Sequence, residues 1–222
     1  MSSDLRFSTK EEIGSFISTA RIHFGNNIAG IDEVGRGALA GPLVVGCVVL
    51  PIDHSITGIK DSKQLSPKRR EELASQILAI GACGLGVCEA SEVDELGPHG
   101  AVSKAALDAI FSCALQTDIN VILCDGNIRL DTDRAYYSII DGDEWIECIS
   151  AASIIAKVYH DKQMELYHEL YPEYGFNSCN GYGTQKHLAS LKEFGLTPLH
   201  RRTYSPCRVI AMEETLDEDQ ET

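Results

Sequence analysis

The chain has 222 residues and lacks the long apolar run that a membrane-spanning helix needs. Its longest apolar stretch, Leu43–Ile52, is about half of the roughly 20 residues that cross a bilayer. The first residues, MSSDLRFSTKEEIG, also lack the apolar core of a signal peptide. We therefore expect a cytoplasmic protein that does not associate with membranes.

Closely spaced cysteine pairs are missing as well. The chain has eight cysteines, but no two of them form a C-x-x-C motif, which argues against a structural zinc site. Most stand in apolar surroundings, as Cys47 and Cys124 do. We expect them to be small buried side chains of a protein in a reducing compartment.

Positive charge is scarce. Lysine and arginine total 19 against 33 aspartates and glutamates, a net charge of −14, which argues against a protein that coats nucleic acid. Six of the last ten residues, 213–222, are acidic and predict a disordered, solvated tail. Basic residues gather at Lys60/Lys63, Lys68-Arg69-Arg70, Lys186/His187 and His200-Arg201-Arg202. These clusters are compatible with a local basic rim around an acidic centre.

The length and a hydrophobic content of 44% predict one globular domain at 1–212, which ends in a small helical part at about 160–212. No internal repeat or linker stands out. Strands are predicted at 28–34, 43–50, 84–89, 120–124 and 136–140, and helices at 9–20, 66–80, 91–96, 100–116, 147–170 and 185–194. This order predicts an α/β fold with a mixed five-stranded sheet flanked by helices.

The first predicted strand carries two adjacent acids, Asp32 and Glu33, inside an apolar run. Burying a charge is costly unless an ionic partner or a metal ion compensates it. Gly35-Arg36-Gly37 follows directly, and glycine lets another backbone approach closely. The combination indicates a metal site beside a groove for a nucleic acid or another phosphate ester.

Two more acids, Asp125 and Asp143, stand at or near the ends of apolar strands. Strand ends of an open α/β sheet meet in one crevice, where charges about 4 Å apart repel by about 4 kcal/mol at an effective dielectric constant of about 20. Divalent cations relieve this repulsion, and oxygen ligands favour Mg²⁺ or Mn²⁺. Two ions roughly 3.5–4 Å apart would activate a water and stabilise the leaving oxygen of a phosphodiester.

One constraint applies to the first pair of acids. Adjacent residues of a strand point to opposite faces of the sheet, so Asp32 and Glu33 share a centre only if the strand ends or twists there. The glycines at 35 and 37 are compatible with such a change of direction.

Most of the signals, taken alone, have an ordinary explanation. Asp125-Gly126 is a common turn, and Asp143 could be a surface acid beside Asp141 and Glu144. Gly35-Arg36-Gly37 and Gly181-Tyr182-Gly183 could be plain loops. Only the acid pair inside an apolar run resists such an explanation, so the order of all the motifs carries the inference.

That ordered set of motifs closely resembles the ribonuclease HII family. The matching segments are GIDEVGRGALAGP at 30–42, DSKQLS at 61–66, CDGN at 124–127, GD at 142–143, SAASIIAKV at 150–158 with Asp161, and YGFNSCNGYGTQKHL through GLTPLHRRTYSP within 174–206. The likeness covers roughly residues 28–206. It implies an RNase H-like fold and a two-metal endonuclease, expected to be a monomer.

The resemblance also implies a substrate and a set of ligands. Such an enzyme would cut the RNA strand of RNA–DNA hybrids, or the 5′ side of a ribonucleotide embedded in duplex DNA, and leave 3′-hydroxyl and 5′-phosphate ends. By position, the metal carboxylates would be Asp32, Glu33, Asp125 and Asp143, with Mg²⁺ or Mn²⁺ as the cofactor.

Further positions resemble the family's substrate-binding residues. Gly35-Arg36-Gly37 would read the ribonucleotide 2′-hydroxyl through the backbone, and Tyr182 would stack at the RNA–DNA junction. The 2′-hydroxyl is the group that separates RNA from DNA, so a bare backbone beside it makes physical sense. Ser62 and Lys63 resemble phosphate contacts, and Lys157 would either do likewise or orient an acid.

Two positions depart from the family's pattern. Asn180 stands where a basic residue usually precedes GYG, and Tyr159-His160 stands where Thr-Arg usually precedes the aspartate at 161. Both changes remove positive charge and leave the carboxylates intact. They predict weaker, salt-sensitive binding rather than altered chemistry.

Three other readings of the motifs stay open at this stage. Another nuclease with an RNase H-like fold, such as a junction resolvase or a DNA exonuclease, would share the carboxylates but would not need the glycine loop and Tyr182. A catalytically silent nucleic-acid-binding module would leave the four acids without a purpose. A metal-dependent phosphomonoesterase would turn over small phosphate esters.

Overall fold

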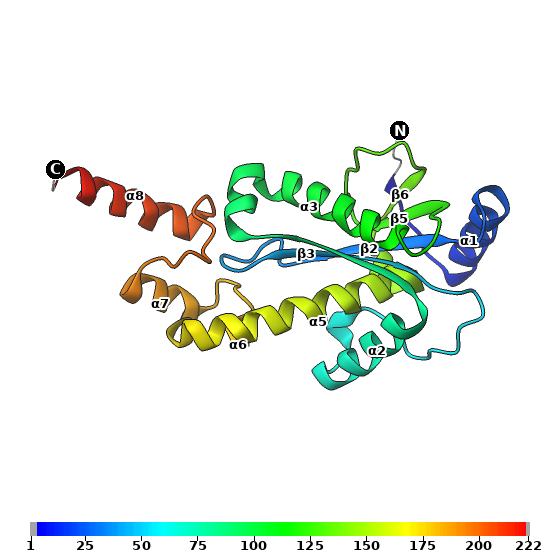
Figure 1. Cartoon of the computed structure of the whole chain (residues 1–222), viewed down its shortest axis with the longest axis horizontal. Coiled ribbons are helices and arrows are strands. Elements are labelled where there is room, and N and C mark those ends of the chain that lie inside the picture. The colour runs from blue at the N-terminus through cyan, green and yellow to red at the C-terminus, as the bar shows by residue number, and fades with distance from the viewer. Residues whose placement is uncertain (1–3, 221–222) are drawn as a thin grey trace.

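The computed structural model describes residues 4–220, and the side chains of residues 5–212. A mixed sheet forms the middle layer, with helix α3 on one face and helices α2 and α5 on the other (Figure 1). The strands are β1 Asp4–Leu5, β2 Ile28–Val34, β3 Leu43–Val49, β4 Ala82–Cys88, β5 Val121–Asp125 and β6 Tyr136–Ile139. Their order across the sheet is β1-β6-β5-β2-β3-β4.

The helices differ widely in length. They are α1 Lys10–Phe24, α2 Pro67–Ile80, α3 Ala90–Ala114, α4 Gly142–Trp145, α5 Glu147–Leu170, α6 Phe176–Cys179, α7 Gln185–Phe194 and α8 Ser205–Gln220, with 3-10 turns η1 Ser62–Gln64 and η2 Pro172–Tyr174. Local sequence explains several boundaries. Ser66 caps α2 through its bond from the Arg69 N–H, ahead of Pro67, and Thr184 caps α7 in the same way.

The predicted fold class is confirmed. All five predicted strands form, and β1 adds a two-residue strand that pairs parallel with β6 at the edge. So short a strand leaves no periodicity to detect. The helices predicted at 91–96 and 100–116 are the two arms of α3, which bends at Gly97 (φ 68°) ahead of Pro98.

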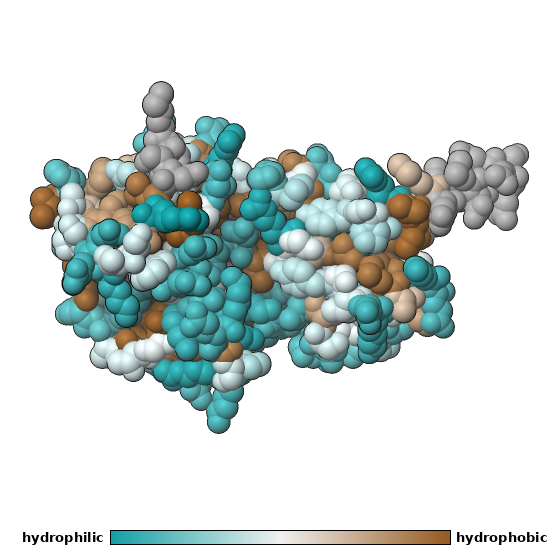
Figure 2. All heavy atoms as spheres, turned by 180° about the vertical axis from the view of Figure 1, so that it is seen from behind, coloured by the Kyte–Doolittle hydropathy of each residue, from teal (hydrophilic) through white to brown (hydrophobic). Residues whose placement is uncertain are grey.

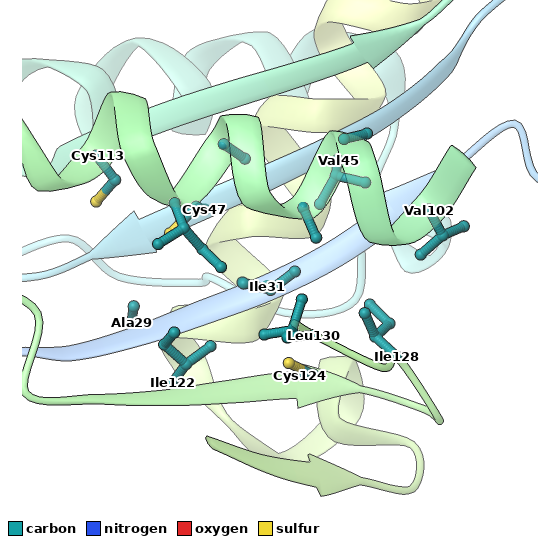
Figure 3. Packing of buried hydrophobic residues seen from close by; sticks show 14 of the residues in the cluster. Ala29, Ile31, Val45, Cys47, Val102, Cys113, Ile122, Cys124, Ile128 and Leu130 are labelled. Carbon is teal, nitrogen blue, oxygen red and sulfur yellow. The ribbon is translucent and has the colours of Figure 1, made fainter. Parts of the chain in front are cut away.

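The larger part of the core lies between the sheet and α3 (Figure 3). Ala29 and Ile31 of β2 and Val45 of β3 point toward α3, whose Val102 and Cys113 face them. The alternation of β2 therefore sends its even-numbered residues to the opposite face, where α5 lies.

Helix α5 lies directly on β2 and β3 because two glycines remove the side chains between them. A β-carbon built on Gly30 would stand 2.2 Å from the Cys148 backbone, and one on Gly46 would stand 2.4 Å from the Ala152 carbonyl oxygen. Any larger residue would push the helix away. This close approach brings the middle of α5 to the end of β2 that carries the acids.

The end of α5 and the elements that follow it form a smaller lobe. Its core includes Met164, Tyr174, Phe176 and Leu191, and it packs against Leu39 and Ala40 of the segment between β2 and β3. The glycine loop, Gly35-Arg36-Gly37, lies just before these two residues in the chain, so the lobe packs beside it. Seen from behind, apolar residues gather on the lobe near the base of α8, where Val209 and Met212 are exposed (Figure 2).

Helix α8 extends into the acidic segment 213–222, for which the sequence predicts disorder. The backbone is helical up to Gln220, in keeping with the good helix propensity of glutamate, leucine and glutamine. Residues 221–222 and the side chains from 213 onward lie outside the described part. The division at residue 212 stays a prediction.

Two of the absences noted in the sequence can be compared with the structure. Across residues 4–220, none of the helices is long and apolar enough to cross a membrane. All eight cysteines lie in the part whose side chains are described, and each is a free thiol. Most are buried, as the apolar contexts predict.

Candidate active site

Three of the four predicted carboxylates lie on, or directly after, three neighbouring parallel strands. Asp32 lies on β2 and Asp125 ends β5, while Asp143 follows β6 and stands in the short helix α4. Because β2, β5 and β6 run parallel, their carboxyl ends share one edge of the sheet. The sequence predicted this edge, although it placed Asp143 at the end of the strand rather than in a helical turn.

The fourth carboxylate, Glu33, was expected to share a centre with Asp32 only if β2 ends or twists at the two acids. The structure meets this condition in part. Strand β2 does not end at the acids, because Asp32 and Glu33 pair with Gly46 and Val45 of β3. Pairing with β5 does end, at Ile31. The Glu33 N–H donates to Asp32 Oδ1 at 2.8 Å, which holds the Asp32 carboxylate against the next residue along β2.

Asp125 and Asp143 are joined through the backbone. Asp125 Oδ1 accepts a hydrogen bond from the Asp143 N–H at 3.2 Å, and the Ser150 hydroxyl of α5 donates to the Asp143 carbonyl oxygen at 2.7 Å. The start of α4 is thus fixed between β5 and α5. The side chain of Asp143 is buried, as is that of Asp32, which is 5% exposed.

Burial is the main cause that raises the pKa values of the four acids, and neighbouring charges add to it for some of them. Burial raises the pKa of Asp32 well above its usual value, and the charges of Asp125 and Glu33 add to this effect. Burial and the neighbouring Asp143 raise the pKa of Asp125 to about 6. Burial also raises the pKa of Asp143 and of Glu33, although Lys63 and Arg36 oppose it. Ionising all four together is unfavourable without added positive charge.

Two cations of the chain reach this cluster. Lys63 Nζ lies 3.3 Å from Asp143 Oδ2 and 4.0 Å from Asp61 Oδ1, on a side chain that is 78% exposed. Burial acts to lower the pKa of Lys63, but Asp143, Asp61 and Asp32 together outweigh burial, and the pKa is raised. Arg36 Nη1 lies 3.4 Å from Glu33 Oε1. Asp32 and Asp125 form no salt bridge among the described side chains.

The donor set fits a divalent cation by its chemistry. All four side chains offer carboxylate oxygens. Of the two best buried, Asp143 forms a salt bridge with Lys63, and Asp32 forms none among the described side chains. Oxygen-only ligation suits Mg²⁺ and Mn²⁺. Within residues 5–212, no three acidic, histidine or cysteine side chains already stand at metal-binding distances, so the carboxylates would have to close around an ion.

The raised pKa of Asp125 predicts a pH-dependent stability of the metal-free protein. Because the pKa rises from 3.8 to about 6 on folding, the folded state holds this proton more tightly, and the stabilisation is lost as pH rises through about 6. With EDTA present, we expect the melting temperature of the wild type to fall, relative to that of Asp125→Asn, between about pH 4 and 7. Circular dichroism melts of both proteins test this, and parallel curves would contradict it.

The glycine loop lies next to the acids and faces Tyr182. Gly35 has φ +83°, and a β-carbon there would stand 2.5 Å from the Pro42 carbonyl oxygen. Gly37 has an ordinary φ, and a β-carbon built on it would have Tyr182 Cε1 as its nearest neighbour, at 3.9 Å. Tyr182 is 41% exposed. The structure therefore brings together the loop and the ring that the sequence paired.

Ser62 and Lys157, two of the predicted substrate contacts, both have partners inside the protein. The Ser62 side chain is buried, and its hydroxyl lies 2.9 Å from the hydroxyl of Ser153, so it does not face a groove. Lys157 pairs with Asp161 at 2.6 Å, in agreement with the alternative that it orients an acid. Ser62 and Lys63 were the two contacts predicted in the DSK segment. Only Lys63 extends into solvent beside the carboxylates.

Fewer basic side chains are exposed around the acids than the basic clusters in the sequence suggest. Arg70, His187, His200 and Arg201 are all buried, because they bind backbone groups or each other inside the fold. His160, one of the departures from the family pattern, is also fully buried beneath Gly35. Burial lowers its pKa, so His160 adds little charge to a groove.

Sequence reasoning missed four residues that shape this site. Asp61 contacts Lys63, Ser153 of α5 contacts Ser62, and Arg201 and Tyr204 bind the carbonyl of Arg36 from the smaller lobe. Asp61 could have been found as the acid directly before Ser62-Lys63. The other three lie 90 to 170 positions away from their partners in the chain, and no local pattern links them.

Comparison with known proteins agrees with these motifs. The family model described as Ribonuclease HII matches residues 29–207. A ribonuclease HII of Enterococcus faecalis is 47% identical over 82% of this chain and 70% of that protein. The ribonuclease H2 of Pyrococcus horikoshii is 28% identical, with a TM-score of 0.69 over 84% of this chain and 98% of that one.

A more distant structure shares the fold alone. Bst-RNase HIII in complex with Mn²⁺ is 18% identical, with a TM-score of 0.65 over 87% of this chain and 72% of that one. The family match covers both the acidic cluster and the lobe that contacts the glycine loop. The chain therefore belongs to the ribonuclease HII family and is an endoribonuclease of the type 2 ribonuclease H class.

Proposed function

We propose that the enzyme hydrolyses the RNA strand of RNA–DNA hybrids and nicks duplex DNA on the 5′ side of an embedded ribonucleotide, leaving 3′-hydroxyl and 5′-phosphate ends. The observation that carries this proposal is the placement of Gly37 next to Tyr182, in a loop whose Arg36 pairs with Glu33 of the acidic cluster. A nuclease that ignored the sugar would have no use for an exposed backbone segment against an aromatic ring. The free thiols support a cytoplasmic location, and we propose that it acts as a monomer.

We further propose that Asp32, Glu33, Asp125 and Asp143 hold two divalent ions, Mg²⁺ or Mn²⁺. When bound, these ions would supply an activated water and neutralise the charge that develops on the phosphodiester. The cluster of raised pKa values supports this role, because added positive charge would stabilise the ionised form of all four acids.

The remaining contacts would position the substrate. Lys63, exposed beside Asp143, would bind a phosphate of the cleaved strand. Arg36, His99 and Arg129 line a cavity next to the loop, which would accept another backbone phosphate. Tyr182 would stack on the sugar and base that follow the ribonucleotide and disfavour a second 2′-hydroxyl there.

Gly37→Val tests the sugar-reading role of the loop. Gly37 has an ordinary φ and open space, so the variant should fold with a melting temperature close to that of the wild type. Its branched side chain would fill the space between the loop and Tyr182, and we expect cleavage to fall at least about tenfold. Steady-state cleavage and thermal melts measure the two effects. The matched control, Gly35→Ala, should lose stability because of its positive φ and the Pro42 carbonyl. An unfolded Gly37→Val would instead mark Gly37 as a structural turn.

A panel of four substrates tests the proposed function against its competitors. The panel is an RNA–DNA hybrid, a DNA duplex with one ribonucleotide, the same duplex without it, and a small phosphomonoester, each with and without Mg²⁺ or Mn²⁺. We expect metal-dependent cleavage of the first two only. Cleavage of all-DNA duplex would indicate a resolvase or exonuclease, and turnover of the monoester a phosphatase. Binding without any cleavage would indicate a silent module.

A further inference from the structure

A buried arginine holds the glycine loop from the smaller lobe. Arg201 is 0% exposed, and its Nη1 donates to the Arg36 carbonyl oxygen at 3.0 Å. Its Nε and Nη2 donate to the Gly41 carbonyl oxygen at 3.3 and 2.9 Å. The Tyr204 hydroxyl donates to the same Arg36 oxygen at 2.7 Å. Two side chains thus converge on one carbonyl of the loop.

Because Arg201 is charged and buried, its hydrogen bonds to the Arg36 and Gly41 carbonyls depend on the position of these carbonyls. No carboxylate among residues 5–212 forms a salt bridge with Arg201, so the two carbonyls and the face of the Tyr204 ring, 5.2 Å away, compensate the guanidinium. A buried charge that loses its partners is costly. Any movement of the Arg36 carbonyl away from Arg201 would therefore be opposed.

The direction of this carbonyl fixes the direction of the next N–H. The Arg36 carbonyl and the Gly37 N–H belong to one planar trans peptide, so they point to opposite sides. The carbonyl points inward, to Arg201 and Tyr204. The Gly37 N–H must then point outward, where Gly37 is exposed beside Tyr182. No acceptor for this N–H is present among residues 4–220.

The same contacts decide which group of this peptide can bind a sugar hydroxyl. A carbonyl oxygen has two lone pairs, and Arg201 and Tyr204 occupy both on Arg36. The peptide therefore faces a ligand with a donor only. We propose that Arg201 and Tyr204 are positioning residues that aim the Gly37 N–H at the 2′-oxygen of the ribonucleotide, an inference that rests on the proposed function.

Tyr204→Phe tests the proposal, with Tyr174→Phe as the matched control. Each variant removes a hydroxyl of the smaller lobe that donates to a backbone carbonyl, that of Arg36 at 2.7 Å for Tyr204 and that of Gly195 at 2.9 Å for Tyr174. The Tyr204 hydroxyl also accepts a hydrogen bond from Arg201 Nη1 at 3.4 Å. In an Asp125→Asn background that prevents cleavage, the dissociation constants of two duplexes are measured. One duplex contains a single ribonucleotide, and the other has the same sequence in all-DNA form.

We expect Tyr204→Phe to reduce the preference for the ribonucleotide duplex about 2- to 10-fold, which corresponds to one hydrogen bond, with unchanged affinity for all-DNA duplex. Tyr174→Phe should leave the preference as in the Asp125→Asn parent. Arg201→Lys, which keeps the charge but not the planar fork, should reduce the preference further. If Arg201→Lys does not fold, Tyr204→Phe decides alone.

Two negative results are distinguishable in this experiment. A parent protein without any preference for the ribonucleotide would overturn the proposed function. A parent with the preference, together with equal values for Tyr204→Phe and Tyr174→Phe, would overturn the positioning role alone. Equal losses on both duplexes would assign Tyr204 a general structural role and would likewise overturn it.

Discussion

Replacing Asp125 with asparagine should reduce metal-dependent cleavage at least about 10³-fold, with the protein still folded and still able to bind its duplex. The loss corresponds to about 4 kcal/mol of transition-state stabilisation, the several kcal/mol that a metal ion supplies to phosphoryl chemistry. Asparagine keeps an oxygen for the Asp143 N–H, so the link between β5 and α4 should persist. Single-turnover cleavage and equilibrium binding measure the two effects.

The matched control for this variant is Asp133→Asn. Asp133 is exposed and lies in the segment between β5 and β6, away from the acidic cluster, so its loss of charge should change cleavage less than twofold. Cleavage by Asp125→Asn at near wild-type rate would remove Asp125 from the metal-binding set. Loss of binding together with cleavage would show that Asp125 acts through the groove rather than through an ion.

Replacing Tyr182 with alanine should reduce cleavage at a single embedded ribonucleotide more than cleavage of a long hybrid. Stacking of an aromatic ring on a base contributes about 1–3 kcal/mol, which predicts a loss of about 5- to 150-fold at the junction. In a long hybrid the residue after the cut carries its own 2′-hydroxyl, so the ring has less to contribute there. The ratio of kcat/KM on the two substrates is the quantity to measure.

Tyr182→Phe provides the control for the ring. The Tyr182 hydroxyl has no hydrogen-bond partner among the described residues, so phenylalanine should keep nearly the full activity. Equal losses for Tyr182→Ala on both substrates would argue against reading of the junction. A large loss for Tyr182→Phe would mean that the hydroxyl, rather than the ring, contacts the substrate.

The sequence predicted the sheet and the acids because both depend on local signals. Runs such as Val121–Asp125 are short, apolar and bounded by turns, and each carboxylate stands at or near a strand end or just beyond one. Parallel pairing then placed Asp32, Asp125 and Asp143 at one edge. The fold class and the carboxylate cluster could therefore be inferred without coordinates.

The orientation of single side chains could not be inferred in the same way. Ser62 and Lys63 are neighbours in one motif, but one is buried against Ser153 and the other extends beside Asp143. His200-Arg201-Arg202 has the composition of a surface patch, yet two of the three residues are buried. The contacts that orient Ser62, Lys63 and Arg201 span 91, 80 and 165 positions of the chain, and one sequence carries no sign of them.

The most direct test of the account is the position of the nick in a labelled DNA duplex that contains one ribonucleotide. With Mg²⁺ or Mn²⁺, we predict a single cut on the 5′ side of the ribonucleotide, with 3′-hydroxyl and 5′-phosphate ends, and no cut with EDTA or in the all-DNA control. A cut on the 3′ side, a cut without metal, or equal cleavage of the all-DNA duplex would contradict it.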